Sequence, residues 1–333
     1  MWGRVDEVAR FAAMLAEDYG WGDCALAALS SAPGADSHTF SVERGGEAVA
    51  VLHAYRKAWI DWIGVRQAWP GRVAACAGLL TDLAGRGYPA PRVIATQQGE
   101  EFALREAWAL LLTSYVDGTT HDYSVAGLWA LGEAVGRLNA LPLRASGDSW
   151  WSLGEMVPKI GERLAAVEAA VPAGWQEWYE ECRHELAAWP GRAGLPVTLI
   201  HADAWAGNAV IGAEGGATLI DWELAGLGSA VLDFGSLLLH GHYDLPGCLP
   251  ARERIAALVG GYCRQRRPNG DELAVLTEAI RFGPVFRSAL FFVAAAEGMW
   301  GERPWQQIGT ERARYPAGSA LAAATHEYLA GVG

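Results

Sequence analysis

The chain has 333 residues, 51% of them hydrophobic and 19% charged, with a formal net charge of −12. This composition is typical of a globular protein with room for two lobes, and it excludes a disordered chain. An acidic chain is a poor general binder of nucleic acid and favours a neutral or cationic small molecule. Five scattered cysteines, none in a C-x-x-C pair, exclude a disulfide framework and a structural zinc site. No apolar run is long enough to predict a membrane span, so we expect a cytoplasmic protein without a membrane partner.

The first part of the chain predicts a small antiparallel sheet flanked by helices. Apolar residues at helical spacing predict helices over Val5–Asp18 and Val73–Ala84. The segment Glu43–Gly46 has the composition of a hairpin turn between two strands. The strands that we expect are Cys24–Leu29, Thr39–Val42, Glu47–Tyr55, Glu101–Arg105 and Trp108–Val116.

Beyond Asp117 and Gly118 the pattern becomes helical. Ser124 is a favourable N-cap for the first of these helices, and one short apolar strand, Pro196–Ile200, interrupts them. The helices that we expect are Ser124–Asn139, Gly154–Val171, Gly174–Ala188, Arg252–Gln265, Asp271–Phe282, Val285–Glu297 and Ser319–Ala330. The fold class is therefore α+β, with a small lobe at 1–113, a hinge at 114–118 and a larger, mainly helical lobe at 119–333.

The most informative polar residues of the chain lie directly after the strand Pro196–Ile200. His201, Asp203 and Asn208 have the spacing H-x-D-x-x-x-x-N. A loop of this length can bring Asn208 back beside Asp203, so that both side chains face one site. Asp203 then accepts or orients the proton of an acceptor hydroxyl, while Asn208 binds a metal ion. We expect His201, the other catalytic-loop residue, to support the loop by hydrogen bonding.

A second carboxylate follows another short strand. Thr218–Ile220 is mostly apolar and leads into Asp221, which we expect to be the second metal ligand, because Mg²⁺ prefers oxygen donors and uses few carboxylates. Glu223 follows two residues later, and Asp233 is expected to cap a helix or to brace the loop. Together these residues predict phosphoryl transfer from a nucleoside triphosphate with Mg²⁺.

At these motifs the chain resembles the aminoglycoside phosphotransferase and choline kinase-like family. HADAWAGN at 201–208 matches the family's catalytic loop, and Ile220–Asp233 matches its pattern I-D-W-E-x-A-x-x-G-x-x-x-x-D. Looser matches are YPAPRV at 88–93, TSYVDG at 113–118 and GEAVGRLNAL at 132–141, with Asn139 where His is common. The resemblance implies a two-lobed protein-kinase-like fold, a catalytic base at Asp203 and metal ligands at Asn208 and Asp221.

The same resemblance implies where a nucleotide binds. The hinge of this fold recognises the base through backbone groups, which places that contact at Ser114, Tyr115 and Val116. The residue types there do not distinguish ATP from GTP. The residues that we expect near the phosphates are Ser37 and His38 in the loop PGADSHTF at 33–40, and His53 and Arg56 on the third strand.

The sheet lobe departs from the family at these phosphate contacts. The family has a Lys or Arg in the middle of the third strand and a Glu in the next helix, whereas this chain has His53 and Cys76 near those positions. Three interpretations follow. Arg56 or Lys57 supplies the cation, His53 contacts phosphate together with His38, or the nucleotide site is degraded.

The acceptor is the part that the sequence constrains least. Family members act on aminoglycosides, macrolides, choline, homoserine and sugars, so the resemblance implies a hydroxyl acceptor that is an aminoglycoside-like compound, another antibiotic or a metabolite. Glu223, Glu297 and Trp300 are candidates for binding an aminated acceptor. The function that we expect is transfer of the γ-phosphoryl group of ATP or GTP to that hydroxyl. The alternative is a catalytically weak, kinase-like binding protein that recognises a peptide or a small molecule.

Overall fold

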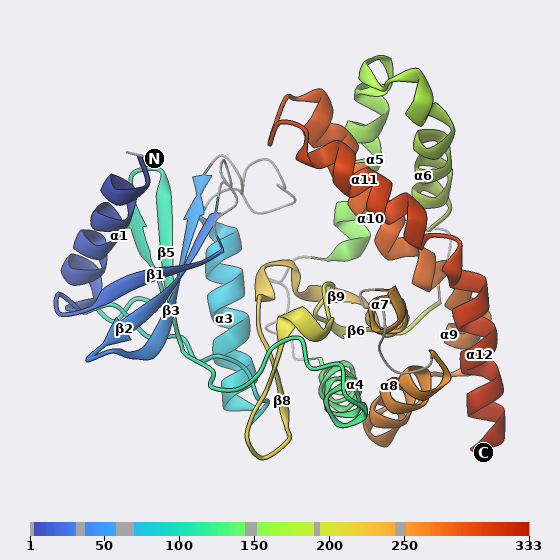
Figure 1. The fold of residues 1–333 in the computed structure, drawn as a ribbon, viewed down its shortest axis with the longest axis horizontal. Helices are drawn as coiled ribbons and strands as arrows, with labels where there is room; N and C mark the ends of the chain where they lie inside the picture. The colour runs from blue at the N-terminus through green and yellow to red at the C-terminus, as the bar shows by residue number, and fades with distance from the viewer. Residues whose placement is uncertain are drawn as a thin grey trace. The chain divides into compact units, whose positions relative to one another are not determined.

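The computed structural model describes residues 3–30, 37–57, 70–143, 152–189, 194–243 and 251–332. The chain divides into two compact units, Met1–Asp117 and Gly118–Gly333 (Figure 1). This division falls inside the segment 114–118, where the sequence places a hinge.

The first unit is built on a five-stranded antiparallel sheet in the order β1-β2-β3-β5-β4. Gly45 and Gly46 turn the chain between β2 and β3 with φ values of 62° and 88°, a conformation that glycine adopts at little cost. The elements of this unit are α1 (Gly3–Tyr19), β1 (Ala25–Ser30), β2 (Ser37–Arg44), β3 (Glu47–Arg56), α3 (Gly71–Gly85), β4 (Ala103–Arg105) and β5 (Trp108–Ser114). The small antiparallel sheet that the sequence predicts is thus present.

The two faces of this sheet carry different residues. Phe40, Leu52 and Trp108 pack with Phe11 of α1 in the core of the unit, and α3 lies on the other side of the sheet (Figure 1). Side chains alternate along a strand, so His53, which follows Leu52, points to the face away from α1.

The second unit is mainly helical and contains two short antiparallel ribbons. β6 pairs with β9, and β7 pairs with β8. The strands are β6 (Val197–Ile200), β7 (Ala209–Ile211), β8 (Ala217–Leu219) and β9 (Gly226–Ser229). The helices are α4 (Val125–Asn139), α5 (Leu153–Ala166), α6 (Gln176–Ala188), α7 (Ala230–Tyr243), α8 (Ala251–Gln265), α9 (Gly270–Ala274), α10 (Leu276–Ala296), α11 (Arg303–Arg314) and α12 (Ala317–Gly331). The short 3₁₀ turns are η2 (Glu168–Ala170), η3 (Ala173–Trp175), η5 (Ala206–Asn208) and η6 (Trp222–Leu224).

Helices α4 and α8 approach so closely that their contact requires glycine. A Cβ atom on Gly132 would overlap the carbonyl oxygen of Leu258, and one on Gly136 would overlap that of Tyr262. The close approach fixes the last turn of α4 against α8, and Tyr262 Oη donates a hydrogen bond to Asn139 Oδ1 at 3.0 Å. Asn139 is thereby held at the position from which it reaches the polar loop described below.

Helix α10 differs from the sequence-based expectation. The sequence predicts separate helices at Asp271–Phe282 and Val285–Glu297, but the structure has one helix, Leu276–Ala296, that continues through Pro284. The helical conformation is interrupted earlier, at Val275, which separates α9 from α10. Tertiary packing along α10 offsets the backbone hydrogen bond that Pro284 cannot donate, which a local pattern does not reveal.

The sequence analysis does not predict the helices α7 and α11. It predicts only that Asp233 caps a helix or braces the loop. Among the described residues, α10 is also the one helix long and apolar enough to cross a membrane by length and composition. Since 61% of its most apolar window is buried inside the protein, it has the character of a core helix.

Candidate active site

The polar loop begins where β6 ends. The chain leaves the β6–β9 ribbon at Ile200 and turns at once through His201 and Ala202. Ala202 has a φ of 65°, a left-handed conformation that costs a non-glycine residue on the order of 1 kcal/mol and therefore needs support from its surroundings. Asp203 follows this turn, and its side chain keeps 29% of its surface exposed. The turn thus presents a carboxylate that a substrate can reach.

Asp233 of α7 holds this turn in place. Its Oδ2 accepts from the backbone N–H of His201 at 2.8 Å, and its Oδ1 accepts from that of Ala202 at 2.8 Å. Asn139 Nδ2 also donates to Oδ2 at 3.0 Å and to the Leu199 carbonyl at 2.9 Å. Complete burial raises the pKa of Asp233, and the hydrogen bonds to its carboxylate oppose that rise. Of the two roles expected for Asp233, the structure shows that it braces the loop.

His201 supports the loop through a hydrogen bond and a ring contact. Its buried Nε2 lies 2.9 Å from the carbonyl oxygen of Ile220, and its ring packs against the ring of Trp222 at 4.8 Å. Because a carbonyl oxygen only accepts, Nε2 must carry the proton of this hydrogen bond. Burial lowers the pKa of His201 and keeps the ring neutral. These contacts agree with the expected supporting role of His201, and its part in catalysis stays a prediction.

Asn208 returns beside Asp203, as the spacing predicts. Asn208 Nδ2 donates to Asp203 Oδ2 at 2.8 Å and to the Asp203 carbonyl at 3.0 Å. These bonds orient the amide and leave its Oδ1 as an oxygen ligand of the kind that hard cations take. The other carboxylate oxygen, Asp203 Oδ1, lies 3.8 Å from Arg287 Nη1.

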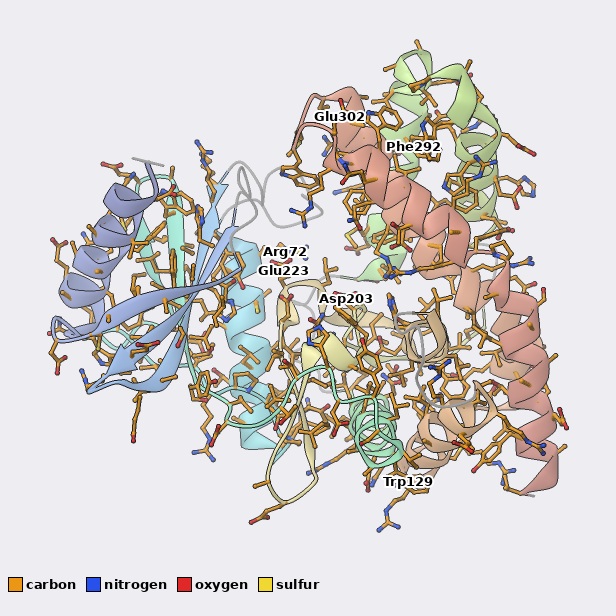
Figure 2. The ribbon with its side chains drawn as sticks, viewed as in Figure 1. Arg72, Trp129, Asp203, Glu223, Phe292 and Glu302 are labelled. Carbon is orange, nitrogen blue, oxygen red and sulfur yellow. The ribbon has the colours of Figure 1, made fainter. Side chains whose placement is uncertain are left out.

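The β7–β8 ribbon brings Asp221 next to this pair. The N–H of Ile220 donates to the carbonyl of Asn208 at 2.9 Å, which ties together the backbones of the two candidate metal ligands. The pKa of Asp221 is raised well above its usual range by desolvation among protein atoms, and further by the carboxylates of Glu223 and Asp203 (Figure 2). A bound cation would relieve the repulsion among these carboxylates.

This donor set fits Mg²⁺. The Asn208 amide oxygen and the Asp221 carboxylate are hard oxygen donors, and the crowded carboxylates attract a divalent cation. Within the described residues, no group of three or more His, Cys, Asp or Glu side chains forms a potential metal site. Mg²⁺ does not need such a group, because it takes one or two protein carboxylates and completes its shell with water and substrate phosphates.

The residues expected at the nucleotide phosphates do not share one face of the sheet. The ring of His38 lies 5.6 Å from that of Phe11 and 5.4 Å from that of Trp108, on the face that α1 covers. Arg56 lines a hollow together with His38 on this same face. His53 points to the opposite face, so the expectation that His38 and His53 contact one phosphate together is wrong.

His53 also carries no charge at neutral pH. Burial lowers its pKa to about 4, and its ring stacks on that of Tyr55 at a centroid distance of 6.0 Å. Asp82 of α3 forms a salt bridge with Arg86, four residues later at the end of the same helix, with 2.6 Å between Oδ2 and Nε. The side chain of Ser37 and the loop residues 31–36 lie outside the described part of the chain.

Two of the three hinge residues already use their backbone N–H groups. Ser114 N–H donates to the Arg92 carbonyl at 2.8 Å, and Tyr115 N–H donates to that of Val49 at 3.3 Å. Among the described residues, no hydrogen bond to a protein acceptor involves the N–H of Val116. Val116 is therefore the hinge residue whose N–H is available to a base.

The residues expected to bind an acceptor are not among those that line a cavity found beside Asp203. Glu223 belongs to the carboxylate group around Asp221. Glu297 accepts from Arg163 Nη2 at 2.7 Å, and Trp300 packs its ring against Phe291. None of Glu223, Glu297 and Trp300 lines that cavity, so their acceptor role stays a prediction.

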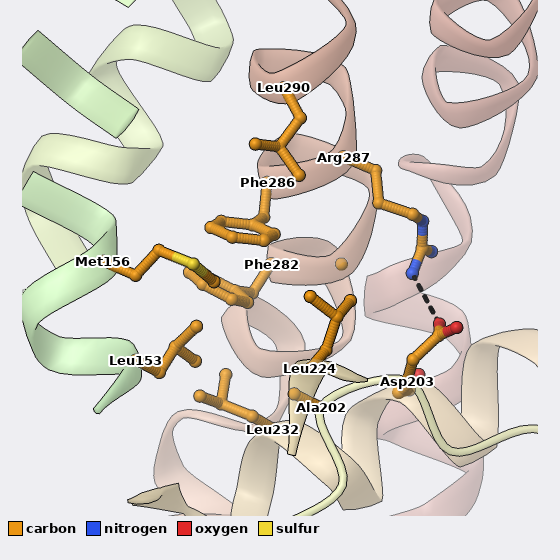
Figure 3. A pocket seen from close by; sticks show the side chains of 12 residues that line it. Leu153, Met156, Ala202, Asp203, Leu224, Leu232, Phe282, Phe286, Arg287 and Leu290 are labelled. Atoms are coloured by element: carbon orange, nitrogen blue, oxygen red, sulfur yellow. Dashed lines mark ion pairs between the residues drawn. The ribbon is translucent and has the colours of Figure 1, made fainter. Parts of the chain in front are cut away.

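The cavity is lined instead by residues that sequence reasoning did not select. Asp203, Arg287 and Ser236 supply its polar side chains, and Phe282 and Phe286 are among its apolar ones (Figure 3). An arginine within the apolar stretch Val285–Ala296 of α10 is the one signal in the sequence that could have drawn attention to Arg287. The serine and the two phenylalanines carry no local signal, because only the packing of α7 against α10 brings them to Asp203.

Comparisons with solved structures show the same fold along nearly the whole chain. An amicoumacin kinase in complex with AMP-PNP and Ca²⁺ is 14% identical, with a TM-score of 0.70 over 95% of this chain and 96% of that one. A microcompartment-associated aminopropanol kinase is 18% identical, with a TM-score of 0.64 over 97% and 98% of the two chains. A choline/ethanolamine kinase family protein from Mesorhizobium loti is 16% identical, with a TM-score of 0.64 over 95% and 98%. None of the curated proteins matches the sequence significantly.

The fold and the carboxylate–amide site together define a two-lobed, protein-kinase-like phosphotransferase. The family model described as the phosphotransferase enzyme family matches residues 31–273. The chain belongs to this family of phosphotransferases. The resemblance and the α+β kinase-like fold that the sequence predicts are thereby confirmed.

Proposed function

We propose that this protein transfers the γ-phosphoryl group of ATP to a hydroxyl group of a small molecule, with Mg²⁺ bound at Asn208 and Asp221. The observation that carries the proposal is the arrangement of Asp203, Asn208 and Asp221 on one pair of ribbons, joined by hydrogen bonds and held by Asp233. A carboxylate at the acceptor hydroxyl, with an amide and a second carboxylate for the metal ion, is the set of groups that phosphoryl transfer in kinases uses. A folded protein without this chemistry has no evident need for the mutually repelling carboxylates of Asp203, Asp221 and Glu223 in one place.

Each residue has a distinct part in the proposed reaction. Asp203 orients the acceptor hydroxyl and takes its proton, because its carboxylate is accessible and held by Asn208. Asp221 and the amide oxygen of Asn208 would hold Mg²⁺, which screens the charge of the nucleotide phosphates when it is bound. His201 and Asp233 keep the loop in the conformation that presents Asp203.

The nucleotide is the less constrained half of the proposal. The amicoumacin kinase binds AMP-PNP and a spectinomycin phosphotransferase of the same fold binds ADP, which favours ATP over GTP as phosphoryl donor. We assign the base to the N–H of Val116. Because His53 is neutral, the phosphate cation is Lys57 at the end of β3 or Arg72, a buried arginine in the first turn of α3 (Figure 2). We place the enzyme in the cytoplasm, where ATP and Mg²⁺ are present.

Titration calorimetry with ATP and GTP, each with and without Mg²⁺, tests this proposal. The wild-type protein is expected to bind ATP in a Mg²⁺-dependent manner. The variant Asp221→Asn should lose most of that dependence, with about tenfold or weaker affinity for Mg·ATP. The variant Asp203→Asn should keep nucleotide binding but lose the slow transfer of phosphoryl to water by about 10²-fold or more.

Asp271→Asn is the matched control, because Asp271 is an exposed aspartate of the same unit outside the site. It should behave like the wild type in every titration. If neither nucleotide binds at millimolar concentration while the protein is folded, the phosphotransferase proposal fails for this chain. The kinase-like binding protein would then be the correct alternative.

A further inference from the structure

The cavity beside Asp203 has a mainly apolar wall. It lies within the second unit and has a volume of about 100 Å³. Its sides come from α5, η6, α7 and α10, with Met156, Leu224, Phe282 and Phe286 facing one another across it (Figure 3). An apolar body placed here is removed from water against aliphatic and aromatic carbon, which stabilises binding in proportion to its buried area.

The charges around the cavity do not suit a cationic acceptor. Among the described residues that line it, Asp203 is the only carboxylate and Arg287 is the only other charged group. Arg287 is held rigidly, because its Nε and Nη2 donate to the two oxygens of the buried Glu311 at 3.0 and 3.2 Å. An ammonium group in this space would face a fixed guanidinium, and the one carboxylate in the lining, Asp203, already lies 3.8 Å from that guanidinium and is assigned to the reacting hydroxyl.

Nor does the cavity require an anion. The two arginines, Arg287 and Arg314, which donate to Glu311 at 3.0 Å each, are balanced by two carboxylates, Glu311 and Asp203. Arg287 Nη2 also lies 3.0 Å from His240 Nε2, and its Nη1 lies near Asp203. The guanidinium is thus surrounded by protein groups, and an uncharged acceptor body is the one that leaves this network intact.

One polar group in the wall stands without a partner. Ser236 of α7 is 8% exposed, and within the described residues its Oγ has no hydrogen-bond partner. Ser236 lines the cavity. A buried hydroxyl without a partner is destabilising, and rotation of the Ser236 side chain towards the cavity would let it pair with an oxygen or nitrogen of a ligand.

We infer that the acceptor is an uncharged alcohol with a compact apolar body, and that Ser236 binds a second polar atom of that body. The inference rests on the proposed function, because Asp203 is taken to be the residue that meets the reacting hydroxyl. The body lies between Met156, Phe282 and Phe286. Arg287 excludes an ammonium group beside the hydroxyl.

The volume sets the size of this body. An apolar cavity of about 150 Å³ holds a benzene molecule, so a cavity of this size holds a group of about four carbon atoms, such as a tert-butyl group. A larger acceptor would place one such group in the cavity and keep the remainder outside it.

A pair of probes that differ only in charge tests the inference. 3,3-Dimethyl-1-butanol and choline have nearly the same shape, with a tert-butyl group in the first and a trimethylammonium group in the second. Saturation-transfer NMR with competition, in the presence of Mg·AMP-PNP, is expected to show at least tenfold tighter binding of the neutral alcohol. Equal or tighter binding of choline would overturn the inference, and so would the absence of binding of the neutral alcohol.

Two variants locate the binding. Leu290→Phe fills part of the cavity and should weaken binding of 3,3-dimethyl-1-butanol by about tenfold, whereas the same change at the exposed Leu143 should have no effect. Ser236→Ala should weaken binding of 3-methyl-1,3-butanediol by roughly three- to tenfold and leave 3,3-dimethyl-1-butanol unchanged. Equal responses of Leu290→Phe and Leu143→Phe would show that the alcohol binds elsewhere, and the inference would fail. If Ser236→Ala affects both alcohols alike, or neither, the assignment of Ser236 fails.

Failure of this inference can be told apart from failure of the proposed function. The NMR measurement reports on the cavity directly and is repeated without nucleotide, so it does not depend on catalysis. A protein that binds Mg·ATP but prefers choline contradicts the inference alone. A protein that binds the neutral alcohol but no nucleotide contradicts the proposed function, and with it the role of the cavity as an acceptor site.

Discussion

Replacing Asp233 by Asn removes the support of the catalytic loop without changing the size of the side chain. The carboxylate accepts from His201 and Asn139 at Oδ2 and from Ala202 at Oδ1. An asparagine has one acceptor oxygen, and placing it at the Oδ2 position keeps two of the three bonds. The backbone N–H of Ala202 then faces the NH₂ group of the asparagine side chain, which can only donate, so this hydrogen bond is lost.

The structure sets the size of the effect. The lost bond to a charged acceptor contributes about 1.5–3 kcal/mol, and the two remaining bonds weaken when the charge is removed. Removing a buried negative charge offsets part of this loss. We therefore expect a net destabilisation of about 2–4 kcal/mol, which is roughly a 4–16 °C lower melting temperature for a unit of this size. Because Ala202 is also released from its left-handed conformation, Asp203 shifts and phosphoryl transfer should fall by about 10²-fold.

Thermal unfolding and the rate of ADP release, measured side by side for Asp233→Asn and the control Asp271→Asn, test this prediction. The expected result is a lower melting temperature together with lost transfer in the first variant alone. A variant at position 233 with wild-type stability and turnover would refute the reasoning, because the clamp would then make no energetic contribution. Loss of stability with unchanged turnover would show that Asp233 supports the fold but does not position Asp203.

Three further predictions concern the fold and the half-buried His53. Gly132→Ala should destabilise the second unit by at least about 2 kcal/mol in urea unfolding, because its Cβ overlaps backbone of α8, whereas Gly161→Ala, with open space around it, should be neutral or gain up to about 1 kcal/mol. Ser124→Ala removes the hydrogen bond that caps α4 at 3.0 Å and should cost about 1 kcal/mol in the same assay, and an unchanged unfolding midpoint would contradict the cap. Because the folded pKa of His53 is about 4, below its unfolded value of 6.5, its contribution to stability is present above pH 6.5 and is lost as the pH falls towards 4. Unfolding at pH 7 and pH 5 should differ by up to about 2 kcal/mol more in the wild type than in His53→Gln, and equal pH dependence of the two would show that His53 is not buried neutral.

Most of the polar residues of the site could be predicted from the sequence, because they lie close to one another along the chain. His201, Asp203 and Asn208 lie within eight residues, and a short loop between two strands has few ways to arrange them. The same holds for Asp221, which a tight ribbon returns to Asn208. Spacing alone therefore predicted which groups meet, and the hydrogen bonds between Asn208 and Asp203 confirm that they do.

The sequence was less informative where alternation or packing decides. A strand places neighbouring residues on opposite faces, so His38, Arg56 and His53 looked alike as phosphate contacts until the register of β2 and β3 separated them. Pro284 predicted a helix break because the local rule ignores the neighbours that stabilise α10.

The amino-acid sequence by itself determined the fold class, the family and the catalytic loop, since each depends on periodicity or spacing along the chain. Only the tertiary structure decided what the reacting hydroxyl would meet. Arg287 and Ser236 lie on α10 and α7, far along the chain from Asp203, and no local pattern joins them. They meet at one cavity because helices that bury their apolar faces against each other also bring together the few polar residues between those faces.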